Sequence, residues 1–313
     1  KGLVKMILGL DIGNITSIGV GDKEDFITES RLREFEELDD FSGNDIVEIN
    51  DKKFIFNEGY FENNVVKHEK ENFINLLYYT IAKTLDKENS KENDVKIVIG
   101  VPAGQYNSEK ERLKKVILNN QCKNIKINGE SRTINIEDIF IAPEGYGAKV
   151  EALQAKKEKV KLLMVDIGGG TSDAALFDEN GRFIGGKSIK VGLLDLYKNV
   201  QEVLDLKYKL SVSLEDARKY FDGELDIRNE KFEVENTYKT EALNKLVKFL
   251  INELRGLYPN ISQYAICLCG GAAGRILPVF KKVYIQAEAI TDIKANAKGF
   301  RKVGLAKWQN QGK

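Results

Sequence analysis

Two segments of this chain repeat one short pattern. Residues 8–18 read LGLDIGNITSI, and residues 163–173 read LMVDIGGGTSD. Each is an apolar run followed by Asp-Ile-Gly, two further residues and Thr-Ser, and the two aspartates, Asp11 and Asp166, lie 155 positions apart, about half of the chain. An acid-and-glycine turn after a buried strand in each half predicts two similar domains that face one ligand.

The chemistry of the two turns suits a metal-bound polyphosphate. Glycine lets backbone N–H groups approach an anion closely, and hydroxyl groups add donors. The candidate phosphate-binding residues are Gly13, Asn14, Thr16, Gly168, Gly169, Gly170 and Thr171. An aspartate would repel phosphate unless a cation intervened, and Mg²⁺ keeps several waters and touches few carboxylates. We therefore expect Asp11 and Asp166 around one hydrated Mg²⁺. A plain hairpin explains either turn alone, but it does not explain a matched pair.

The composition narrows the function classes. The chain has 313 residues, which suits two domains, and 48 basic residues balance 48 acidic ones. A net charge of zero argues against direct coating of nucleic acid, which needs a basic field. No apolar run reaches the ~18 residues of a membrane span. Cys267 and Cys269 lie in an apolar run and are expected to be small buried residues in a reducing cytoplasm.

The hydrophobic pattern predicts an α/β fold with mixed sheets. Each half begins with strands and then alternates helix and strand. The expected strands are 4–11, 16–20, 45–49, 52–56, 95–101, 124–127, 132–136, 140–142, 160–166, 171–177, 182–189 and 263–269. The expected helices are 73–85, 108–118, 192–206, 213–221, 238–256 and 293–309, with Ser108 and Glu111 as a capping box. The Lys/Glu-rich stretch around His68, the single histidine, is expected to be a solvated helix.

One acidic residue between the repeats is a candidate catalytic group. Residues 142–148 read APEGYGA, with Pro143 at the expected first position of a helix and Glu144 in its first turn. A carboxylate there could orient or deprotonate an attacking water near the Mg²⁺. A favourable charge at a helix N-terminus is the alternative.

Two further pairs are candidates for contact with a sugar or a base. Gly270 and Gly271 follow an expected strand, where bare backbone can lie along a ribose or a base, although a simple strand–helix turn is the alternative. Glu215 and Lys219 are spaced i, i+4 on an expected helix and could reach a ribose or a purine edge. A surface ion pair is the alternative for that second pair.

Taken in order, these motifs resemble the actin, heat-shock chaperone and sugar kinase superfamily of ATPases. The resemblance rests on Asp11-Ile-Gly13, on Glu144 in Pro-Glu-Gly-Tyr-Gly, on Asp166-Ile-Gly-Gly-Gly-Thr171 and on Gly270-Gly271. It implies two similar actin-like, ribonuclease-H-like lobes with mixed sheets around a nucleotide cleft. It also implies that ATP or ADP binds there with Mg²⁺, with GTP as the alternative nucleotide. The two Asp-Gly turns would bracket the phosphates, Glu144 would align the water, and the late Gly-Gly would hold the adenosine.

The resemblance also implies domain boundaries. Domain I would comprise residues 1–160 and 295–313, with a small subdomain at about 26–93. Domain II would comprise residues 161–294, with a small subdomain at about 190–262.

Within the superfamily the chain is most similar to bacterial actin-like filament ATPases of the plasmid-segregating ParM group. Residues 295–304, ANAKGFRKVG, resemble a segment near the end of ParM-like proteins, and residues 99–102, IGVP, resemble a strand-to-proline step in the first lobe. This implies head-to-tail filaments that segregate plasmid DNA through a centromere-binding adaptor protein, with no direct contact to nucleic acid or membrane. A small-molecule kinase, an MreB-like cytoskeletal filament, a chaperone-like ATPase and a non-hydrolysing nucleotide sensor are the alternatives.

The first turn departs from the family pattern in one respect. Actin and some ParM proteins carry a lysine late in this turn, whereas Thr16-Ser17-Ile18 contains no base. We therefore expect Mg²⁺, backbone amides and hydroxyl groups to balance the phosphate charge without a lysine.

Overall fold

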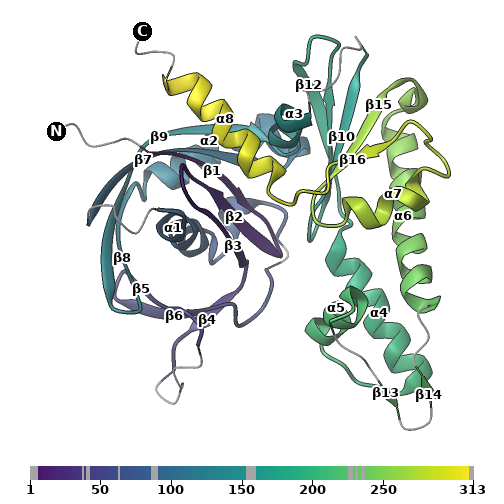
Figure 1. The fold of residues 1–313 in the computed structure, drawn as a ribbon, viewed down its shortest axis with the longest axis horizontal. Coiled ribbons are helices and arrows are strands. Elements are labelled where there is room, and N and C mark those ends of the chain that lie inside the picture. Colours follow the sequence, from purple (N-terminus) through teal and green to yellow (C-terminus); the bar gives the residue numbers. More distant parts are fainter. Residues whose placement is uncertain are drawn as a thin grey trace.

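The computed structural model describes residues 6–36, 39, 43–62, 64–85, 91–152, 160–224, 228–229, 232–233 and 237–309. Two lobes, each built on one sheet, lie side by side (Figure 1). This confirms the α/β fold with two mixed sheets that the sequence predicts.

The first lobe is built on a nine-stranded sheet in the order β3-β2-β1-β7-β9-β8-β5-β6-β4. The strands are β1 (Met6–Ile12), β2 (Thr16–Val20), β3 (Asp25–Glu29), β4 (Leu32–Glu34), β5 (Ile46–Ile49), β6 (Lys52–Phe56), β7 (Glu92–Val101), β8 (Cys122–Ile127) and β9 (Glu130–Pro143). Strand β1 is antiparallel to β2 and parallel to β7. The sheet curves around helix α1 (Phe73–Thr84), whose apolar side chains fill the interior of the lobe (Figure 1).

The second lobe repeats this arrangement on a smaller scale. Its sheet has the order β12-β11-β10-β15-β16, and β10 is antiparallel to β11 and parallel to β15. The strands are β10 (Leu162–Ile167), β11 (Ser172–Phe177), β12 (Phe183–Ile189), β15 (Ala265–Cys269) and β16 (Glu288–Ala289), with a separate hairpin of β13 (Arg228–Asn229) and β14 (Phe232–Glu233). The helices are α4 (Leu193–Tyr208), α5 (Leu214–Asp222), α6 (Thr237–Leu257) and α7 (Ala273–Phe280), with a 3-10 turn η3 (Ile261–Gln263). The sequence repeat is therefore a structural repeat.

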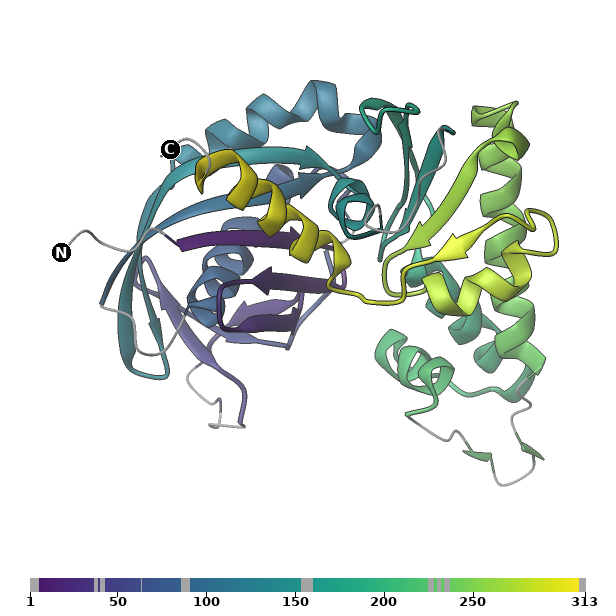
Figure 2. The ribbon, with the colours of Figure 1, turned by 45° about the horizontal axis from the view of Figure 1, so that its top comes forward.

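The last helix, α8 (Ala295–Gln309), returns to the first lobe, as its sequence predicts. It packs on β1 and β7 and against α3 (Tyr146–Ala152), and Figure 2 shows it lying across this sheet. Glycine makes this close packing of backbones possible, because a Cβ atom on residue Gly299 would stand 1.9 Å from the carbonyl oxygen of Gly147. A Cβ atom on Gly9 would stand 1.9 Å from the carbonyl oxygen of Ala297.

Two local predictions are wrong. Helix α2 (Tyr106–Leu118) begins before Ser108, whose hydroxyl donates to the Gln105 carbonyl at 3.1 Å and caps no helix end. Strand β9 continues to Pro143, which lies opposite Val101 of β7, so Pro143 does not open a helix. Glu144 consequently lies in the turn before α3 and not in the first turn of a helix. Parallel pairing with β7 outweighs the local preference of proline for a helix start.

Both cysteines of strand β15, Cys267 and Cys269, are free and buried, as expected, whereas Cys122 is free and exposed. None of the helices that the structure describes is both long and apolar enough to span a membrane.

Candidate functional site

The two repeated turns line one cleft between the lobes. Its volume is 260 Å³, and it is bordered by the turn after β1 and by the turn after β10. This volume lies just below the roughly 300–1,000 Å³ of typical ligand pockets. The residues of the sequence prediction that line the cleft are Asp11, Gly13, Asn14, Thr16, Glu144, Asp166, Gly168, Gly169, Thr171, Gly270 and Gly271.

The turns have the same internal hydrogen bond and touch each other. The Gly13 amide donates to the Thr16 carbonyl at 2.9 Å, and the Gly168 amide donates to the Thr171 carbonyl at 2.9 Å. A Cβ atom on Gly169 would stand 2.6 Å from a side-chain carbon of Ile15, so the two turns approach each other directly across the cleft. Only bare backbone fits at Gly169.

Three carboxylates gather where the turns meet. Burial, followed by the charges of Asp11 and Glu144, raises the pKa of Asp166 well above its usual value. Burial also raises the pKa of Asp11, although the nearby ammonium of Lys67 opposes this. The side-chain amide of Asn296, at the start of α8, donates to the Asp166 carboxylate, and its oxygen accepts from the Ala148 amide at 3.1 Å. Asn296, which lies in the segment 295–304 noted in the sequence, therefore helps to hold the Asp166 side chain of the second turn in place.

A buried lysine that the sequence analysis missed enters this acidic centre. Lys67, in the 3-10 turn η1 (Lys67–Glu69), is 4% exposed and lies 2.6 Å from a Glu144 oxygen and 3.9 Å from an Asp11 oxygen. Lys70 is also buried and lines the cleft, where burial and the charge of Lys67 lower its pKa to about 8. The stretch around His68 is thus not a solvated helix. Two lysines from outside the first turn, Lys67 and Lys70, line the cleft.

The residues fit a cation that keeps most of its own water. Within the described ranges, no three His, Cys, Asp or Glu side chains form a ready-made metal-binding group. Asp11 and Asp166 nevertheless face one cleft from opposite lobes, and the charge of Asp11 helps to raise the pKa of Asp166. A divalent cation between them would relieve that repulsion, and Mg²⁺ binds through one or two carboxylates when phosphate and water complete its shell.

The far end of the cleft is lined by α4, α5, α7 and the glycine turn after β15. Gly270 has a φ of +89°, and a Cβ atom there would stand 2.6 Å from an Asp166 oxygen, so the turn requires glycine on both grounds. Beyond it, Asp222 forms ion pairs with the guanidinium groups of Arg218 and Arg275, and all three residues line the cleft.

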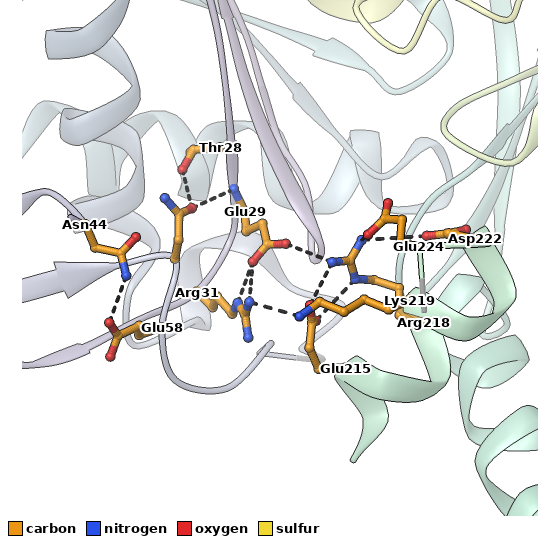
Figure 3. A network of polar contacts seen from close by, with 11 residues as sticks. Thr28, Glu29, Arg31, Asn44, Glu58, Glu215, Arg218, Lys219, Asp222 and Glu224 are labelled. Carbon is orange, nitrogen blue, oxygen red and sulfur yellow. Dashed lines mark hydrogen bonds and ion pairs between the residues drawn. The ribbon is translucent and has the colours of Figure 1, made fainter. Parts of the chain in front are cut away.

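Three residues of the sequence prediction are not among those that line the cleft: Gly170, Glu215 and Lys219. The Glu215 carboxylate instead forms ion pairs with Arg218 at 2.7 Å, with Lys219 at 3.5 Å and with Arg31 of the first lobe at 3.8 Å (Figure 3). Arg218, which follows Glu215 by about one turn of α5, lines the cleft instead.

Comparison with known proteins identifies the fold. Residues 9–147 match the family model described as actin like proteins N terminal domain. The structure is similar to that of Ta0583, an archaeal actin homolog, with a TM-score of 0.82 and 20% identity over 95% of this chain and 98% of that one. The chain has the actin-like fold.

Two further structures agree with this assignment. A ParM from Clostridium botulinum, solved as a 15-stranded filament, has a TM-score of 0.80 and 17% identity over 96% of this chain and 99% of that one. The ADP complex of Ta0583 has a TM-score of 0.79 and 17% identity over 95% and 98% of the two chains. No protein among the curated sequences matches the chain. At these identities the likeness establishes the fold, and the ParM group remains a resemblance.

Proposed function

We propose that the protein is an actin-like, nucleotide-dependent ATPase that polymerises into filaments. The observation that carries this proposal is the direct approach of the two Asp-Ile-Gly turns across one cleft, with carboxylates and buried lysines between them. Backbone amides and hydroxyl groups of both turns would bind the phosphates of ATP, with GTP as the alternative nucleotide. Asp11 and Asp166 would hold a hydrated Mg²⁺, which would balance charge on the phosphates.

The buried ion pair in the cleft suggests how turnover would be controlled. Glu144 is the candidate for orienting or deprotonating the attacking water, but its carboxylate is 2.6 Å from the Lys67 ammonium. A terminal phosphate beside Lys67 would compete for that ammonium and release the carboxylate. Glu144 would then be available to water only when a triphosphate is bound.

A nucleotide that contacts both lobes favours the closed conformer through differential contacts. Closed monomers would stack head to tail, and such heterologous contacts give open filaments when the rotation does not close a ring. Each stable contact should bury about 1,200–2,000 Å² in total. Hydrolysis would weaken the contact and make the filament dynamic.

The cellular role we propose is segregation of plasmid DNA in the cytoplasm through a centromere-binding adaptor protein. A net charge of zero supports an indirect link to DNA, because direct coating needs a basic field. The free buried cysteines of β15 support a reducing compartment.

The test is light scattering and pelleting of the purified protein with Mg-ATP, Mg-GTP, Mg-ADP or no nucleotide. We expect polymer with a triphosphate, and Glu144→Gln should form filaments that persist because phosphate release is slowed. Glu130→Gln, an exposed carboxylate on β9, is the matched control and should behave like the unmodified protein. A protein that stays monomeric at tens of micromolar with both triphosphates would contradict polymerisation, and unchanged turnover in Glu144→Gln would remove Glu144 from catalysis.

A further inference from the structure

Four charged side chains form a closed ring of ion pairs that joins the two lobes beside the cleft. Glu29, the last residue of β3, pairs with Arg31 at 2.5 Å, and Glu215 pairs with Arg218 on α5 at 2.7 Å. The two pairs are linked across the lobes by Arg31–Glu215 at 3.8 Å and by Arg218–Glu29 at 3.4 Å. The charges alternate around this ion-pair ring, as Figure 3 shows.

The side chains of the ring are only partly exposed to water. The exposed fractions of its side chains are 30% for Glu29, 18% for Arg31, 20% for Glu215 and 18% for Arg218. By contrast, the pair Lys52–Glu34 in the first lobe is 67% and 64% exposed. Lower exposure reduces screening, and a network of alternating charges holds its geometry better than an isolated pair.

One member of the ring also belongs to the cleft. Arg218 lines the cleft and pairs with Asp222, which in turn pairs with Arg275 at the same end. Glu29 and Arg31 do not line the cleft, and they come from the other lobe. Arg31 is further fixed by Phe61, whose ring centroid lies 5.1 Å from its guanidinium carbon. Opening the lobes at this end would therefore break two ion pairs, one of which joins Arg218 to Glu29 of the first lobe.

We propose that Glu29 and Arg31 are positioning residues that hold Arg218 over the cleft and slow the exchange of bound nucleotide. This inference rests on the proposed nucleotide site and assigns a regulation to it. The ring holds the lobes together at the α5 end, so a nucleotide leaves only after the cross-lobe pairs separate. Because these pairs are electrostatic and partly exposed, salt should weaken them and accelerate exchange.

The variants Glu29→Gln and Arg31→Gln test this role, with Arg33→Gln as a matched control. Arg33 pairs with Asp39 at 2.7 Å and Glu58 at 2.8 Å, all within the first lobe, so its loss removes similar ion pairs without touching the ring. The readout is the release rate of a fluorescent ADP analogue chased with unlabelled ATP. We expect release to be about two- to fivefold faster in both ring variants, a size typical of partly exposed pairs, and unchanged in the control.

Salt and a conservative variant separate positioning from a general structural effect. Between about 0.1 M and 1 M salt the screening length falls from ~10 Å to ~3 Å, so the unmodified protein should approach the ring variants in release rate. Arg31→Lys keeps the charge and should recover part of the slow release. Equal release rates in the unmodified protein, both ring variants and the control would overturn the proposal.

A nucleotide-free arm tests the ring independently of the proposed function. Hydrogen–deuterium exchange of α5 and of the turns at 13–16 and 168–171 should be faster in Glu29→Gln and Arg31→Gln than in Arg33→Gln. Exchange that matches the control would show that the ring does not hold the lobes and would overturn the inference. Faster exchange without any nucleotide binding by the unmodified protein would instead contradict the proposed function, and with it a role of the ring in nucleotide exchange.

Discussion

At the scale of single residues, the buried lysine of the cleft is the most consequential side chain. Burial alone would lower the pKa of Lys67, but the carboxylates of Glu144 and Asp11 outweigh burial and raise it. The ammonium therefore stays charged, and it partly balances the carboxylates that line the cleft. A cation in this position lets the acidic centre persist when no Mg²⁺ is bound.

Removing this ammonium should be costly. Lys67→Met leaves the Glu144 carboxylate, which is 12% exposed, without its partner, and breaking a buried ion pair costs about 3–5 kcal/mol. We expect a loss of that order in the free energy of unfolding, measured by urea denaturation without Mg²⁺ or nucleotide. The double variant Lys67→Met/Glu144→Gln should recover much of it, because no unpaired charge remains. A single variant as stable as the unmodified protein would contradict the pairing.

A second buried acid gives the protein a predictable pH dependence. Asp173 is 1% exposed and accepts from the Ala103 amide at 2.9 Å, from Ser188 at 2.5 Å and from Thr171 at 2.9 Å. Burial, followed by the charge of Glu144, raises its pKa from 3.8 to about 7. Between these values the folded protein binds a proton that the unfolded chain does not, so this contribution to stability is present at low pH and is lost as the pH rises towards 7.

The variant Asp173→Asn should remove this dependence. Its stability relative to the unmodified protein should improve by about 2 kcal/mol between pH 5 and pH 7.5, because one proton taken up on folding contributes about 1.4 kcal/mol per pH unit. Chemical denaturation of both proteins at the two pH values measures the difference. A difference that does not change with pH would show that Asp173 is ionised at both.

The sequence predicts the two turns well and the lysines poorly, for a physical reason. Asp11 and Asp166 are followed at once by the glycines and hydroxyl groups that complete each turn, so the whole signal is local. Lys67 reaches Glu144 only through the folded first lobe, across 77 positions, and a lysine in a charged stretch resembles any solvated lysine. Arg218 is missed for the same reason. It lines the cleft, whereas its neighbours Glu215 and Lys219 do not, and its contact with Glu29 of the other lobe forms only in the folded protein.

At the scale of elements, the packing of α8 depends on glycines that allow backbone contact. The sequence predicts this helix, but it does not show which face meets α3. Gly299→Ala would place a Cβ atom 1.9 Å from the Gly147 carbonyl, so α8 must shift and the Asn296–Asp166 contact with it. We expect a loss of about 1–3 kcal/mol, as for overpacking elsewhere, measured by denaturant unfolding.

Gly256→Ala is the matched control, because Gly256 lies in α6 and a Cβ atom there would meet nothing within 4 Å. Alanine is the better helix former by about 1 kcal/mol, so this variant should gain stability where Gly299→Ala loses it. Equal effects at the two positions would mean that helix propensity, and not the contact with α3, decides the outcome.

At the scale of the whole molecule, the cleft lies between two lobes that each contribute one Asp-Ile-Gly turn to it. This symmetry predicts that equivalent substitutions in the two turns have equivalent effects. If one metal-bound nucleotide bridges the turns, Asp11→Asn and Asp166→Asn should have the same effect although they lie in different lobes. Burial raises the pKa of both aspartates and so disfavours their ionised forms. A neutral asparagine at either position should therefore leave the ligand-free protein folded. The loss of ligand binding can then be separated from a loss of folding.

Thermal unfolding with and without Mg-ATP measures this effect. A ligand at 100 times its dissociation constant stabilises the folded state by about 2.7 kcal/mol, which should raise the melting temperature of the unmodified protein by several degrees. Asp205→Asn, an exposed carboxylate on α4, should retain the rise, whereas Asp11→Asn and Asp166→Asn should both lose it. If only one of the two variants lost the rise, the nucleotide would be held by one lobe, and closure of the cleft by a shared metal would be wrong.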